Sequence, residues 1–202
     1  MKLVREYIIF EKFTEDSDPI QDMDIGIIPQ IKKWMNERTV FSKSQYKILK
    51  NGTINIFKSF GMWDLKGFKL DELPEYIKFN ILYGDFHFTQ AKLTTLKGCP
   101  RIVKGSIYLG YNNLSSLKYG PEKVGVGYYC HNNKLKSLEG VAKVIGKTFE
   151  CSGQTIQFVS KYLPEIVGED FKHRLKIGDK PVSEELIRKY VNVKRNVEYR
   201  TH

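Results

Sequence analysis

The middle of the chain repeats its apolar positions when it is aligned with itself at a shift of 21 residues. Five aligned columns are apolar in all four units. The columns are Phe86/Ile107/Tyr128/Phe149, Phe88/Leu109/Cys130/Cys151, Leu93/Leu114/Leu135/Ile156, Leu96/Leu117/Leu138/Val159 and Val103/Val124/Ile145/Ile166. A shared spine at a fixed period predicts a solenoid, because no single unit can bury its apolar side alone.

Within a unit, Ile107 and Leu109 alternate with period two, which predicts a short strand with one buried face. An earlier coil matches at a longer shift of 23 residues, through Trp63, Leu65, Leu70 and Leu73. The segment Phe171–Lys172–His173 resembles one more strand, out of register by one residue. We therefore predict about five coils in a parallel sheet, followed by a closing strand.

The flanking segments predict caps that cover the ends of the solenoid. Helical periodicity occupies residues 1–13 and 27–38, and Asn51–Gly52 predicts a hairpin turn before the first coil. At the other end, Ser183 is a good N-cap for a short helix with Glu184 and Glu185 in its first turn. We expect this helix to close the C-terminal end.

Two segments, 107–114 and 128–135, resemble the leucine-rich-repeat core L-x-L-x-x-N-x-L. Asn112 and Asn133 fall where that family carries an asparagine ladder, in which a buried amide satisfies backbone groups that a tight turn leaves unpaired. The equivalent positions hold Ala91 and Gln154. We expect those two coils to be looser or differently bonded there.

The units Leu114-Ser115-Ser116-Leu117 and 135–140 also resemble the leucine-rich-repeat-like proteins of large tailed bacteriophages, as do residues 12–20 and 51–54. The resemblance covers most of the chain up to about residue 168. It implies a small accessory protein made in an infected bacterium, and such genes often encode inhibitors of host defence enzymes or toxins.

The expected fold class is α+β, a short leucine-rich-repeat-like solenoid capped by N-terminal helices and a hairpin and by a C-terminal helix. We assign residues 1–58 to the N-terminal cap and 59–168 to the solenoid. Residues 169–202 hold the closing strand, the helix and a basic tail, and the three parts form one compact domain.

The outward residues of the strands form the expected recognition surface, in a row with His131 beside it: Asp64, His87, Tyr108, Tyr129, Glu150 and Lys172. Because neighbouring strands lie about 4.8 Å apart, Tyr108 and Tyr129 stand side by side. Tyrosine is enriched at binding hot spots. Two interpretations stay open, a contact for a protein partner and a cross-strand pair that only supports the sheet.

The chain is basic, with 33 Lys and Arg against 23 Asp and Glu and a net charge of +10. Five cations occupy the tail, with Tyr190 and Tyr199 interleaved: Arg188, Lys189, Lys194, Arg195 and Arg200. Such a pattern suits contacts with single-stranded nucleic acid. The alternatives are a solubilising surface and a frayed terminus.

The sequence shows none of the catalytic or phosphate-binding motifs that we sought. Its four histidines and its cysteines at 99, 130 and 151 lack the spacing of a metal site. We therefore expect no enzyme, no metal and no cofactor. The absence of a long apolar run or a secretory leader favours a cytoplasmic protein without a membrane span, in the host cell if phage-encoded.

These observations favour a non-enzymatic module that binds a protein, with an inhibitor of a host antiphage defence protein or toxin as the expected role. A nucleic-acid-binding accessory protein and a structural protein of the virion are the alternatives. The sequence does not determine the partner, the binding face or the oligomeric state.

Overall fold

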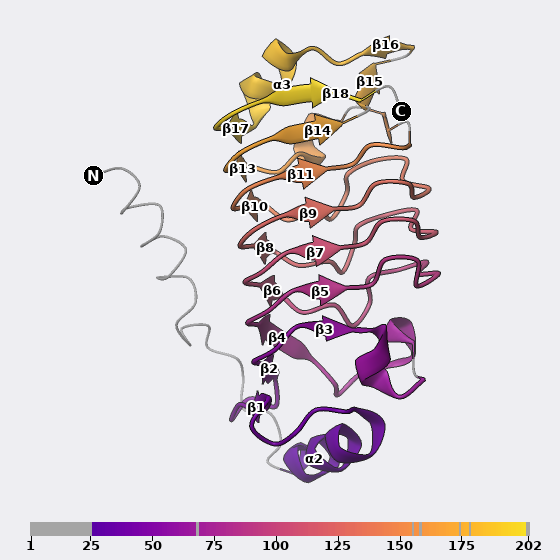
Figure 1. Cartoon of the computed structure of the whole chain (residues 1–202), viewed down its shortest axis with the longest axis vertical. Helices are drawn as coiled ribbons and strands as arrows, with labels where there is room; N and C mark the ends of the chain where they lie inside the picture. Colours follow the sequence, from indigo (N-terminus) through magenta and orange to yellow (C-terminus); the bar gives the residue numbers. More distant parts are fainter. Residues whose placement is uncertain are drawn as a thin grey trace, which may run out of the picture.

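The computed structural model describes residues 26–67, 69–154, 156–157, 159–173, 175–177 and 179–200. It is a β-solenoid of about six turns, built from short parallel strands with few helices (Figure 1). Each turn places one strand in a first sheet of eight strands, bends, and places the next in a second sheet of seven strands. The helix predicted over residues 1–13 lies outside the described residues.

The first sheet runs along the solenoid in the order β1, β2, β4, β6, β8, β10, β13, β17. Its bounds are β1 Tyr46–Ile48, β2 Ile54–Ile56, β4 Phe79–Leu82, β6 Ile102–Val103, β8 Lys123–Val124, β10 Val144–Ile145, β13 Ile166–Val167 and β17 Asn192–Val193. The strands β1 and β2 are antiparallel, which confirms the hairpin predicted at Asn51–Gly52, and the other pairs are parallel.

The second sheet lies beside the first and is parallel throughout. Its strands are β3 Phe60–Gly61, β5 Phe86–His87, β7 Ile107–Tyr108, β9 Tyr128–Tyr129, β11 Phe149–Glu150, β14 Phe171–His173 and β18 Val197–Tyr199. A third sheet of three strands joins β12 Ile156–Gln157, β15 Leu175–Ile177 and β16 Lys180–Pro181. Short 3₁₀ segments complete the third side at Met62–Leu65, Leu70–Glu72 and Ser160–Tyr162.

The predicted apolar spine is confirmed. Ile107 pairs with Tyr128 and Tyr128 with Phe149, and all three side chains are fully buried. The rings of Tyr128 and Phe149 meet edge to face at 5.8 Å, and those of Phe149 and Phe171 at 5.0 Å. Stacked turns therefore bury one continuous core, as the 21-residue period requires.

Two register changes break the strict period. Ile145 pairs with Val167, so Val167 continues the column that the sequence assigned to Ile166, whose side chain is 37% exposed. Phe149 pairs with Phe171, which confirms the predicted shift of one residue at the closing strand. Both changes follow from one extra residue in the turn before β13.

The register predicted for the first coil is wrong. Phe60, rather than Trp63, pairs with Phe86 and is fully buried, whereas Trp63 is 76% exposed. Leu65, Leu70 and Leu73 are buried as predicted; Leu65 ends the first 3₁₀ segment, Leu70 begins the second, and Leu73 follows it. The misassignment arose because 26 residues, rather than 23, separate Phe60 from Phe86.

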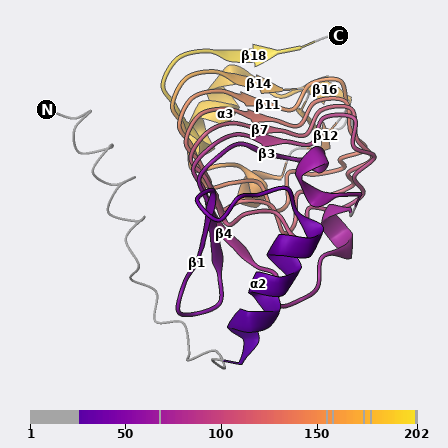
Figure 2. The same ribbon diagram turned by 60° about the horizontal axis from the view of Figure 1, so that its bottom comes forward.

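The N-terminal end is covered by α2, Ile27–Arg38, whose side chains Ile31, Trp34 and Met35 are buried (Figure 2). At the other end, the helix α3, Glu184–Tyr190, begins after Ser183, whose hydroxyl accepts a hydrogen bond from the Leu186 N–H. This N-cap was predicted. The strands β17 and β18 follow α3 along the chain and add one more strand to each main sheet, and α3 packs against both of them at this end of the solenoid (Figure 1).

Amide side chains form a ladder beside the second sheet. The Asn112 amide donates to the carbonyls of Phe88, Leu109 and Gly110, and its oxygen accepts from the Leu93 N–H. Asn133 repeats this pattern one turn later. Gln154 also donates to two carbonyls, but its oxygen accepts from the Asn133 N–H, so this coil is differently bonded, as expected.

Replacing Asn112 by alanine is expected to lower the free energy of unfolding by about 3 kcal/mol, because several buried backbone groups lose their partner. Thermal or urea unfolding followed by circular dichroism measures the change. Asn113→Ala is the matched control, because the Asn113 side chain is exposed and its removal leaves the hydrogen bonds of the Asn112 side chain in place. Equal losses in the two variants would contradict the structural role of the ladder.

The Tyr128 hydroxyl is buried in the spine without a hydrogen-bond partner among the described residues. A buried, unpaired hydroxyl is destabilising, because folding removes it from water without compensation. We expect Tyr128→Phe to raise the free energy of unfolding by roughly 1 kcal/mol. A clear loss of stability in urea unfolding would show that the hydroxyl has a bound partner.

His173 lies in the core with 1% exposure, and burial lowers its pKa to about 4. The unfolded chain binds the proton near pH 6.5, so stability is complete above that pH and falls as the pH decreases toward 4. The loss should approach about 3 kcal/mol. We expect His173→Leu to flatten this part of the stability–pH curve, and a slope equal to that of the parent chain would refute the assignment.

Candidate functional site

Three aromatic rings stack along the outer side of the second sheet. His87, Tyr108 and Tyr129 occupy equivalent positions of β5, β7 and β9. The ring centroids of His87 and Tyr108 lie 4.8 Å apart at an interplanar angle of 3°, and those of Tyr108 and Tyr129 lie 5.2 Å apart at 8°. The sequence therefore placed these three residues correctly side by side.

Gly127 provides the surface on which Tyr129 lies. A side chain at Gly127 would meet the Tyr129 ring and hydroxyl where they now lie, so the glycine leaves the space that this ring occupies along its strand. Burial raises the pKa of the Tyr129 hydroxyl, and the neighbouring Tyr108 and Glu150 act in the same direction. The Tyr129 hydroxyl is thus a neutral donor and acceptor at physiological pH.

Trp63 extends the row beyond His87. Gly61 pairs with His87, and a Cβ atom at Gly61 would lie 3.6 Å from Cδ1 of Trp63, so the exposed indole lies beside the place of the missing side chain. Asp64, predicted to lie in this row, instead is 8% exposed. Its carboxylate accepts hydrogen bonds from the Lys58 ammonium and the Gly61 N–H, at 2.7 and 2.8 Å. The prediction that Asp64 lies in the outward row is therefore wrong, for the same reason as the register of the first coil.

His131 and Tyr111 occupy the two columns that follow the row, His131 in the column of Gly110 and Tyr111 in that of Asn132. The His131 imidazole covers Gly110, where a side chain would collide with it, and its Nδ1 lies 3.0 Å from the Asn132 amide nitrogen. The Tyr111 ring meets the His131 ring edge to face at 5.1 Å and is 55% exposed. We call the six residues Trp63, His87, Tyr108, Tyr111, Tyr129 and His131 the aromatic face.

The row continues into charged residues toward the C-terminal end. Glu150 pairs with Tyr129, Lys172 with Glu150, and Glu198 with Lys172. The Ser152 hydroxyl donates to the Glu150 carboxylate at 2.9 Å. The predicted residue Glu150 therefore lies at the border between the aromatic face and an alternating row of acids and bases.

The predicted basic tail is part of the last turn. Arg188 contacts Glu184 at 2.7 Å, Arg200 contacts Glu198 at 2.6 Å, and Arg195 lies 4.0 Å from Glu169. The Lys189 ammonium lies over the Tyr190 ring, and Lys194 follows β17 in the corner between the sheets. Carboxylates thus accompany three of the five cations that were expected to contact nucleic acid, and the tail is folded up to residue 200.

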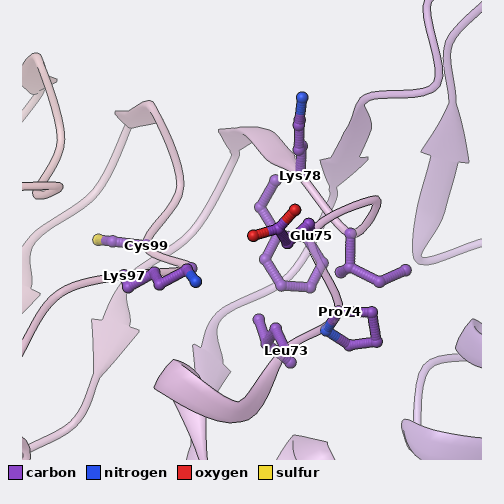
Figure 3. A pocket seen from close by; sticks show the side chains of 9 residues that line it. Leu73, Pro74, Glu75, Lys78, Lys97 and Cys99 are labelled. Atoms are coloured by element: carbon purple, nitrogen blue, oxygen red, sulfur yellow. The ribbon is translucent and has the colours of Figure 1, made fainter.

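A small cavity of about 210 Å³ lies on the third side, among Leu73, Pro74 and Phe79. Figure 3 shows the Cys99 sulfur turned away from Leu73 and Pro74. Burial raises the pKa of the Cys99 thiol above its ordinary value, so the thiol stays protonated and weakly nucleophilic. No histidine lines the cavity to act as its base, and this cavity carries no recognisable catalytic arrangement.

The described residues contain no cluster of three or more His, Cys, Asp or Glu side chains that could hold a metal ion. None of their helices is long and apolar enough to cross a membrane. The three cysteines are free thiols, and Cys130 and Cys151 are buried in the core column where the sequence placed them.

No protein-family model matches the chain, and no curated protein or solved structure is significantly similar to it. The function must therefore be inferred from the geometry of the protein's surface. Sequence reasoning missed two residues of the aromatic face. Trp63 was missed because the wrong register assigned it to the buried column. Tyr111 was missed because its position varies in residue type from one repeat to the next, and only its positive φ distinguishes it.

Proposed function

We propose that the protein is a non-enzymatic binding module that recognises another protein through its aromatic face. The single observation that carries this proposal is the stack of His87, Tyr108 and Tyr129, extended by the exposed Trp63. Large, partly exposed aromatic side chains on a rigid sheet supply contact area at a small cost in conformational entropy.

The orientation of the rings favours a protein over a nucleic acid. Tyr108 has a ring against each face, His87 on one side and Tyr129 on the other. A nucleic-acid base binds an aromatic residue by stacking on its face, and both faces of Tyr108, at the centre of the row, are occupied. The row instead presents ring edges and hydroxyls, which suit apolar and hydrogen-bonding groups of a protein surface.

Backbone strain at Tyr111 supports the same surface. Tyr111 has φ +56°, in the left-handed region, whereas the equivalent corner two turns later is Gly153 with φ +72°. A side chain there costs roughly 1 kcal/mol relative to glycine. Tyr119, in a turn outside both main sheets, has the same strain at φ +67°, so strain alone does not mark a recognition residue. At Tyr111 it supports recognition because the strained residue also places an exposed ring against His131 of the aromatic face.

The resemblance of the repeat units to phage leucine-rich-repeat-like proteins leads to the narrower proposal. We infer a phage-encoded, leucine-rich-repeat-like protein that inhibits a host antiphage defence protein or toxin from the host cytoplasm. The aromatic face would then cover a surface of that host protein. The basic charge, in this interpretation, keeps the chain soluble and steers it toward an acidic partner.

The test compares proteins captured from infected host cells by the parent chain and by the double variant Tyr108→Ala/Tyr129→Ala. A specific partner should bind the double variant at least about thirty-fold more weakly, since two hot-spot tyrosines are removed. Dissociation constants measured with the purified partner give the ratio between the two chains, and circular dichroism verifies that the variant folds.

Tyr119→Ala is the matched control, because Tyr119 is 71% exposed in a turn outside both main sheets. It should bind like the parent chain, and Tyr111→Gly should weaken binding without loss of thermal stability. Undiminished capture by the double variant would exclude the aromatic face. Binding of oligonucleotides that falls steeply with salt, equal in all variants, would instead support the nucleic-acid alternative.

A further inference from the structure

The second sheet ends in an unpaired strand edge at β18. The register pairs Phe171 with Val197 and His173 with Tyr199. The Phe171 N–H donates to the Asn196 carbonyl, and the Arg200 N–H donates to the His173 carbonyl. Because backbone groups alternate in direction along a strand, the N–H and C=O groups of Val197 and Tyr199 point away from β14. No described strand pairs with that edge.

At this end of the solenoid α3 packs against β17 and β18, but the β18 side chains themselves are less covered than those of β14. Phe171 and His173, on β14, are 0% and 1% exposed, because β18 lies over them. Their equivalents on β18, Val197 and Tyr199, are only half-buried, although the Tyr199 ring meets the His173 ring at 5.7 Å. Another strand placed beside β18 would cover these two side chains as β18 covers those of β14.

The outward charges define what that strand should carry. Glu150, Lys172 and Glu198 alternate in sign on β11, β14 and β18. Arg200 follows Glu198 on the same side of the strand, and their charged groups lie 2.6 Å apart. A strand that continues the alternation would place a cation opposite Glu198 and an anion opposite Arg200.

We propose that this strand is β18 of a second copy of the chain, so that the protein forms a two-fold dimer through its C-terminal end. The two strands run antiparallel, with Tyr199 of each copy opposite Tyr199 of the other. Glu198 of each copy then lies opposite Arg200 of the other, twice by symmetry. The free backbone groups of Tyr199 form a hydrogen-bonded pair.

Self-complementarity selects this partner and this register. Moving the centre by one residue to Glu198 would place two glutamates opposite each other, which is repulsive. At the N-terminal end the edge strands are β1 and β3, and α2 packs at that end. Because a two-fold contact uses the same edge on both copies, it closes at two copies rather than growing into a filament.

The experiment is sedimentation equilibrium of the full chain over a range of concentrations. The parent chain should show a reversible monomer–dimer equilibrium. Glu198→Arg and Arg200→Glu should each raise the dissociation constant at least about tenfold, because two opposed pairs become repulsive. An equimolar mixture of the two variants should recover the dimer, since each new side chain lies opposite its complement.

Tyr199→Pro is the second variant. Proline there removes the N–H that points away from β14 and leaves the bonds to β14 intact, so a folded monomer is expected. A parent chain that stays monomeric at every concentration overturns the proposal. So does a dimer that persists in Tyr199→Pro, or a mixture of the two charge variants that fails to associate more tightly than either alone.

Discussion

The whole fold depends on hydrogen bonding between successive turns at a strand spacing of about 4.8 Å. That spacing places each residue directly beside the equivalent residue of the next turn. A side chain is therefore tolerated only if it packs against the side chains at the equivalent positions of the neighbouring turns. The corner between the sheets shows the limit most clearly. A Cβ atom at Gly146 or Gly168 would collide with the carbonyl oxygen of the preceding turn, Gly125 or Gly146. At these two positions only bare backbone fits, although the same corner holds Lys104 two turns before Gly146.

The same spacing acts on the surface. Inside the molecule it stacks Tyr128 and Phe149 into the spine, and outside it stacks His87, Tyr108 and Tyr129 into parallel rings. The two sets of rings differ in geometry. In the spine, the rings of Tyr128 and Phe149 meet edge to face, whereas the outer rings of His87, Tyr108 and Tyr129 stay parallel and leave their edges to solvent.

Much of the fold could be predicted from the sequence because the period is a physical constraint rather than a preference. The spine, the hairpin before the first coil, the Ser183 cap and the shifted strand at Phe171 all follow from hydrophobic spacing or local turn chemistry. The second strand of each turn was missed, because two-residue strands such as Lys123–Val124 are too short to show alternation. The first coil was misplaced, because a longer loop shifted the match from Phe60 to Trp63.

The candidate site was predictable only where it shares the register of the repeat. Tyr108 and Tyr129 were correctly placed, while Asp64 was wrong because its assignment inherited the misplaced first coil. Tyr111 needs a different kind of reasoning. Its corner series reads Gln90, Tyr111, Asn132 and Gly153, all with positive φ. In these four turns the backbone takes the left-handed conformation there, which glycine or asparagine adopts with least strain. Gln90 departs from this preference as Tyr111 does, so the strain at Tyr111 is informative only together with the contact between its ring and the His131 ring.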